Sequence, residues 1–111
     1  MSTTFRLQIP TFDLPYGAVG DLCVKYSVQE LALFGSILRA DFRPDSDIDF
    51  LVVFRDNDLG PWMGKLQDFE HDLSQILGRK ADVVLKASVE QSDNYIRRSE
   101  ILRNAAVIYA A

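Results

Sequence analysis

Three aspartates at alternate positions, Asp45, Asp47 and Asp49, stand at the start of an apolar run that is otherwise suited to burial. Isolated carboxylates are costly to bury, so the pattern implies a compensating cation or a set of hydrogen bonds. Asp47 and Asp49 are two residues apart and should point from the same face of a strand. Without a cation, two like charges there would repel each other and raise their pKa values.

Three interpretations of this cluster compete. A polar turn explains Asp45, which lies beside Pro44, but it explains Asp47 and Asp49 less well. An EF-hand calcium loop needs glycine at its sixth position and glutamate at its twelfth, where this chain has Phe50 and Asp56, so the calcium interpretation fails. A divalent-metal site for phosphoryl chemistry fits better, because paired carboxylates suit Mg²⁺ and leave room for substrate phosphate.

Two further features belong to the pattern of a phosphoryl-transfer site. Asp82 lies near the start of the run KADVVL, 80–85, where it would complete the metal coordination and accept the proton of the nucleophile. The alternative for Asp82 is a solvated charge at the edge of a strand, without a functional role. Gly35 permits close approach of the backbone, and Ser36 offers a hydroxyl at the start of a short helical turn. This pair predicts a phosphate cradle.

The elements that must position these residues alternate between strand and helix, which predicts one α/β domain over residues 1–111. Runs rich in β-branched and aromatic residues are typical of strands, and apolar residues at steps of three and four are typical of helices. We expect strands over 28–35, 47–54, 80–85 and 105–111, a helical turn after Gly35, and helices over 14–26 and 61–78.

Capping patterns indicate where two of the helices begin or end. Gly78 is suited to the C-cap of the helix over 61–78. Ser88 with Gln91 resembles a capping box that opens the last helix, which would carry on one face Tyr95, Ile96, Ser99 and Leu102.

Composition narrows the classes of function. Twelve Lys and Arg against 16 Asp and Glu give a net charge of −4, which disfavours nonspecific binding to nucleic acid. Cys23 is the single cysteine, so an intrachain disulfide is excluded and a place in the core is expected. His71 lies among polar residues and is expected in solvent.

No apolar run approaches the ~20 residues of a membrane helix, and no signal-peptide pattern is present, so we expect a cytoplasmic domain.

The spacing between the Gly-Ser pair and the aspartates is the most specific signal. Ser36 is followed by ten residues and then Asp47-Ile48-Asp49, which resembles the G-S-x10-D-x-D signature of the nucleotidyltransferase superfamily that includes DNA polymerase beta. The stretch GSILRADFRPDSDIDFLVVF is similar to the minimal nucleotidyltransferases (MNT), although Ala40 stands where that family favours glycine. The resemblance covers nearly the whole chain. It implies a polymerase beta-like nucleotidyltransferase core, an α+β fold with a small mixed sheet and flanking helices.

The same resemblance implies roles for individual residues. The carboxylates would be catalytic and bind Mg²⁺: Asp47, Asp49 and Asp82. Gly35 and Ser36 would hold the β- and γ-phosphates, and the other contacts to the triphosphate would come from Arg39 and Ser46.

The resemblance also implies a partner. Stand-alone MNT proteins are typically encoded beside a HEPN-domain protein, and they transfer AMP from ATP to a tyrosine of that ribonuclease toxin. We therefore expect an antitoxin with adenylyltransferase activity in a hetero-oligomer, without direct binding to nucleic acid or membrane. Two alternatives stay open: an antitoxin that neutralises its partner by contact alone, and a nucleotidyltransferase that acts on a small molecule.

Overall fold

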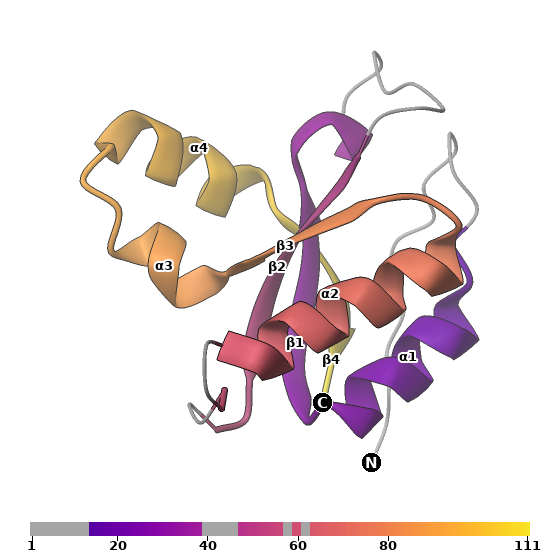
Figure 1. Cartoon of the computed structure of the whole chain (residues 1–111). Coiled ribbons are helices and arrows are strands. Elements are labelled where there is room, and N and C mark those ends of the chain that lie inside the picture. Colours follow the sequence, from indigo (N-terminus) through magenta and orange to yellow (C-terminus); the bar gives the residue numbers. More distant parts are fainter. Residues whose placement is uncertain (1–13, 39–46, 57–58, 61–62) are drawn as a thin grey trace.

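The chain folds around a four-stranded mixed sheet (Figure 1). The computed structural model describes residues 14–38, 47–56, 59–60 and 63–111, and the side chains of Ser36 and Ile37 lie outside the description. The elements in chain order are α1 (Tyr16–Lys25), β1 (Val28–Phe34), the 3-10 turn η1 (Gly35–Leu38), β2 (Ile48–Phe54), α2 (Gly64–Leu77), β3 (Ala81–Leu85), α3 (Lys86–Glu90), α4 (Tyr95–Asn104) and β4 (Ala106–Ala110).

The sheet has the order β3-β2-β1-β4. β1 is antiparallel to both β2 and β4, whereas β2 and β3 are parallel and joined through α2. Each predicted strand is therefore present, and β2 occupies the expected central position. The mixed sheet with flanking helices confirms the predicted fold class.

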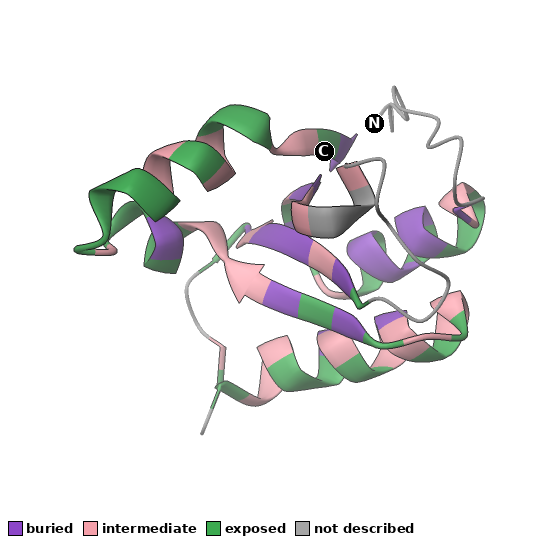
Figure 2. Cartoon of the chain, turned by 90° about the horizontal axis from the view of Figure 1, so that it is seen from above, coloured by how far each residue is buried: buried purple, intermediate pink, exposed green. Residues whose placement is uncertain are grey.

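The two faces of the sheet are covered by different helices. α1 and α2 lie on one face, where Phe50, Phe69 and Tyr109 are among the largest fully buried side chains (Figures 1 and 2). On the other face, Val89 of α3 and Ile101 of α4 pack with Leu51 and Ala32 in a smaller apolar cluster. The second face has the smaller apolar cluster, and it also carries Asp49 and Asp82.

Single residues in the helices follow the sequence predictions. Gly78 is the C-cap of α2 with φ +68°, a left-handed conformation that favours glycine. Cys23 is fully buried, and burial raises the pKa of its thiol to about 12, so it is a protonated core residue. His71 is exposed on α2. The predicted start of this helix at Pro61 lies outside the described residues.

The predicted last helix is present and Leu102 packs as predicted, but its predicted start and the predicted burial of Tyr95 and Ile96 are wrong. Ser88 lies inside the short helix α3, and α4 begins after Asn94, whose Oδ1 accepts a hydrogen bond from the backbone N–H of Arg97 at 3.1 Å. Asparagine is among the strongest N-cap residues, and here it takes the place assigned to the Ser88–Gln91 box. The helix consequently packs with Ile101 and Leu102, while Tyr95 and Ile96 are 68% and 77% exposed.

None of the helices in the described ranges combines the length and the apolar character needed to cross a membrane.

Candidate active site

The predicted carboxylates come from the starts of two neighbouring parallel strands. Asp49 is the second residue of β2 and Asp82 is the second residue of β3, and the register pairs them directly. Side chains alternate along a strand, so both lie on the face opposite buried Ile48 and Ala81. Asp49 is half-buried and Asp82 is exposed. The structure therefore brings these two carboxylates together on the α3–α4 face.

Gly35 lies against Asp49. Strand β1 pairs with β2 so that Phe34 is opposite Asp49, and the chain turns into η1 at the next residue. Gly35 has φ +79°, and a Cβ added there would overlap Oδ2 of the Asp49 carboxylate. Only glycine lets the backbone turn this closely around the carboxylate. The predicted cradle and the predicted metal ligand are thus in direct proximity.

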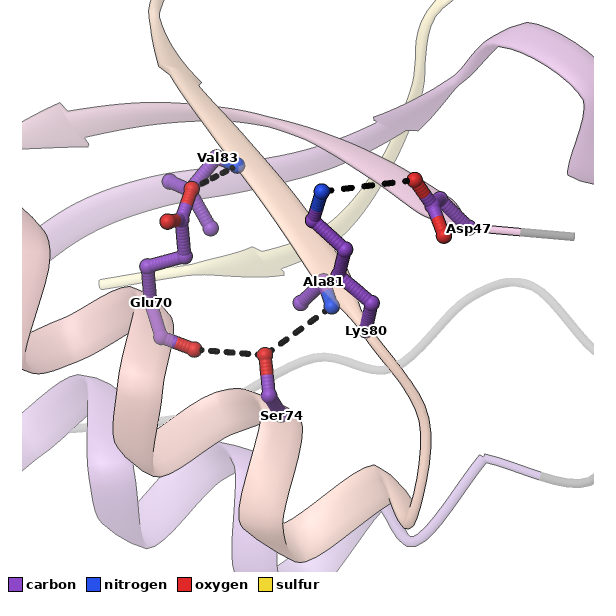
Figure 3. A network of polar contacts seen from close by, with 6 residues as sticks. All are labelled: Asp47, Glu70, Ser74, Lys80, Ala81 and Val83. Atoms are coloured by element: carbon purple, nitrogen blue, oxygen red, sulfur yellow. Dashed lines mark hydrogen bonds and ion pairs between the residues drawn. The ribbon is translucent and has the colours of Figure 1, made fainter.

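Asp47 lies just before β2 and is paired differently. Its Oδ2 is 3.9 Å from Nζ of Lys80, the residue that precedes β3 (Figure 3). Both side chains are at least half exposed, at 50% and 72%, so this ion pair contributes little to stability. Within the described residues, no three Asp, Glu, His or Cys side chains are close enough together to hold a metal ion.

The remaining predicted contacts cannot be placed. Ser36 belongs to η1, but its side chain lies outside the described residues, as do Arg39 and Ser46.

Helix α2 fixes the strand that carries Asp82. The backbone N–H of Ala81 donates to Oγ of Ser74 at 2.9 Å, and that of Val83 donates to Oε2 of Glu70 at 2.8 Å (Figure 3). Ser74 Oγ in turn donates to the carbonyl of Glu70 at 2.9 Å. These bonds satisfy the N–H groups on either side of Asp82 at the edge of the sheet.

We expect Glu70→Ala to lower the free energy of unfolding by roughly 1.5–3 kcal/mol, because the Val83 N–H loses a charged acceptor. Chemical denaturation measures this loss. Gln67→Ala is the matched control, since Gln67 is exposed on the same helix and has no comparable bond to β3. Equal stability of the two variants would contradict the assignment.

A cavity of about 620 Å³ opens beside Asp49 and Gly35. This volume is in the range of small-molecule and cofactor sites. Its apolar lining comes from Phe34, Leu38 and Ile101, and its polar wall comes from α4: Arg97, Glu100 and Asn104. No motif in the sequence marks these three residues. Their spacing of three and four on one helix was the available signal, although a solvated helix face shows the same spacing.

The chain matches the family model described as "Nucleotidyltransferase domain" over residues 17–105, which contain Gly35, Asp49 and Asp82. The chain belongs to this nucleotidyltransferase family. The match includes every helix and strand that the structure describes except β4, and it includes all of α1 apart from its first residue, Tyr16.

Two curated relatives support this assignment. The nucleotidyltransferase is 37% identical over 75 residues to a Methanocaldococcus jannaschii protein named as a candidate protein adenylyltransferase, with 68% of this chain and 72% of the relative covered. It is 34% identical over 70 residues to the protein adenylyltransferase MntA of Thermococcus cleftensis, with 63% and 68% covered.

Solved structures share the fold. A structure described as that of a candidate minimal nucleotidyltransferase superposes with a TM-score of 0.61 and 29% identity, covering 81% of this chain and 85% of its own. A toxin–antitoxin complex with AMP-PNP has a TM-score of 0.65 at 17% identity, covering 88% and 75%. Shewanella oneidensis tri-AMPylated HEPN toxin in complex with MNT antitoxin has a TM-score of 0.51 at 15% identity, covering 86% and 73%. The last two likenesses concern the fold alone.

Proposed function

We propose that this nucleotidyltransferase is an antitoxin that transfers AMP from ATP to a tyrosine of a partner HEPN ribonuclease toxin. The observation that carries the proposal is the contact of Gly35 with Asp49 at the edge of a nucleotide-sized cavity, with Asp82 as the register partner of Asp49. The names of the relatives supply the class of acceptor, because one of them is the protein adenylyltransferase MntA. ATP as donor sets the reaction in the cytoplasm.

The carboxylates present fit a magnesium ion. Mg²⁺ is commonly bound through one or two carboxylates together with substrate phosphates and water, and Asp49 with Asp82 provides such a pair. Asp47 would join them by exchanging its exposed ion pair with Lys80 for the metal. When bound, the ion would neutralise charge on the polyphosphate.

The residues of the chain would then have separate tasks. The Gly35–Ser36 segment would hold the β- and γ-phosphates, together with Arg39 and Ser46. Asp82, the more exposed carboxylate of the pair, would accept the proton of the tyrosine hydroxyl. The hydroxyl oxygen forms a bond to the α-phosphorus in line with the bond that breaks, and pyrophosphate leaves.

A second candidate is an antitoxin that acts by contact alone. The observation in its favour is the ion pair of Asp47 with Lys80, together with the lack of a three-carboxylate group among the described residues. In that case the Asp49–Asp82 pair would have no part in neutralisation.

Asp82→Asn distinguishes the two candidates. Asparagine keeps the volume of the side chain and removes its charge, so the variant should fold and bind the partner. We expect labelling of the partner to fall by a factor on the order of a hundred or more, the scale of a positioned base. The assay combines a pull-down, a labelling reaction with ATP and Mg²⁺, and a test of the partner's ribonuclease activity on one preparation.

The matched control is Asp21→Asn, which changes an exposed aspartate of α1, on the opposite face of the sheet. The control should label the partner as the wild type does. An Asp82→Asn variant that binds, fails to label and still neutralises its partner fully would establish contact as the mechanism.

A further inference from the structure

Helix α4 presents a stripe of side chains to the cavity that holds Asp49. Arg97, Glu100, Ile101 and Asn104 all line the cavity, and their spacing places them on one side of the helix over successive turns. Gly35 and Asp49 line the same cavity from the sheet. Charges on α4 therefore belong to the wall that faces the predicted phosphate cradle.

Among the three arginines of α4, Arg97 is the one that lines this cavity. Its backbone N–H is bonded to Asn94, but its guanidinium makes no ion pair or hydrogen bond to any residue that the structure describes. Arg98 is already engaged, because its Nη1 donates to the carbonyl of Ser92 at 3.2 Å and its guanidinium lies 5.3 Å from the Tyr95 ring centre. Arg103 is exposed in the last turn, away from the cavity lining.

Arg97 has the charge and the geometry to bind a polyphosphate in this cavity. The whole chain has a net charge of −4, so an anion that enters a cavity containing Asp49 and Glu100 needs a local cation. A guanidinium presents a rigid fork of N–H donors that matches two phosphate oxygens. We propose that Arg97 contacts the polyphosphate of the nucleotide bound in this cavity, as a binding residue that no sequence motif marks. This inference rests on the proposed function.

Glu100 provides a test of whether the effect on binding depends on the sign of the charge. It lines the same cavity one turn from Arg97 and carries the opposite charge. If a polyphosphate lies there, neutralising Arg97 must weaken binding, whereas neutralising Glu100 must leave binding unchanged or strengthen it. Arg103→Gln is the matched control for the loss of a positive charge from α4.

The experiment is a calorimetric titration of the full chain with a non-hydrolysable ATP analogue in Mg²⁺, and separately with adenosine. It compares the wild type with Arg97→Gln, Arg97→Lys, Glu100→Gln and Arg103→Gln, each checked for an unchanged unfolding temperature. We expect Arg97→Gln to weaken binding of the analogue by about tenfold to a hundredfold, the range for a hydrogen bond to a charged group. Arg97→Lys should recover part of the loss, and adenosine binding should not change.

Three results would overturn the inference. Arg97→Gln could bind the analogue as Arg103→Gln does, or it could lose adenosine binding to the same extent as analogue binding. Glu100→Gln could weaken analogue binding as much as Arg97→Gln. Each of these leaves the proposed function standing as long as the wild type binds the analogue. A wild-type chain that binds no analogue overturns the proposed function and the inference together.

Discussion

Replacing Asp49 with asparagine is expected to lower nucleotidyl transfer by about a hundredfold or more while the domain stays folded. The side chain is half-buried between Gly35 and the cavity, and its register partner is Asp82. Asparagine has nearly the same volume but lacks the charge that would hold a divalent cation and so position the polyphosphate. Initial rates of transfer with ATP and Mg²⁺ measure the effect, with circular dichroism as the check on folding.

Asp68→Asn is the control for this substitution. Asp68 is exposed on α2, on the other face of the sheet, and the same loss of one negative charge there should leave the rate unchanged. Wild-type rates in the Asp49 variant would exclude this carboxylate from the reaction. An equal loss in both variants would point to net charge instead of the site.

Replacing Gly35 with alanine is expected to damage both stability and transfer. Alanine at φ +79° is strained, at a cost of about 1–2 kcal/mol. The new methyl group would also overlap the Asp49 carboxylate, which would have to move. Displacing this carboxylate should reduce transfer to a level close to that of the Asp49→Asn variant.

Two other glycines separate these effects. Gly78 has φ +68° with nothing within 4 Å of an added Cβ, so Gly78→Ala should show the backbone strain alone, with normal transfer in the folded protein. Gly17 lies in α1 with open space and no positive φ, so Gly17→Ala should be neutral or slightly stabilising. Thermal unfolding and transfer rates for the three variants measure both contributions. A Gly35→Ala variant with normal transfer would contradict the close contact with Asp49.

Much of the fold could be predicted because local patterns agreed with the tertiary structure. Past Asp49, the strand over 47–54 is apolar on both faces, and this is what a central strand between two covered faces requires. The C-cap Gly78 followed from backbone conformation alone. In contrast, the Ser88–Gln91 pattern did not mark the start of the last helix, because Ser88 lies inside α3 and Asn94 caps α4.

The candidate site was only partly predictable, because local sequence patterns mark some of its residues and tertiary packing places the others. The fixed spacing of the G-S-x10-D-x-D signature marked Gly35 and Asp49, and Asp82 was marked by its place near the start of the next predicted strand. The pairing of adjacent strands then brings these residues close together. The wall from α4 depends on how a later helix lies over the second face, which no local pattern determines. In the sequence alone, Arg97 is indistinguishable from a solvent-exposed surface arginine, and only the structure shows that it lines the cavity.

The proposed activity is tested most directly by following the α- and γ-phosphates of ATP during reaction with the proposed HEPN partner. The partner is incubated with this chain, Mg²⁺ and ATP that carries label either on the α-phosphate or on the γ-phosphate. We expect α-label to become covalently attached to the partner and γ-label to be released as pyrophosphate. Attachment of γ-label would show phosphoryl transfer instead, and no attachment of either label to a partner that this chain binds and silences would contradict the proposed activity.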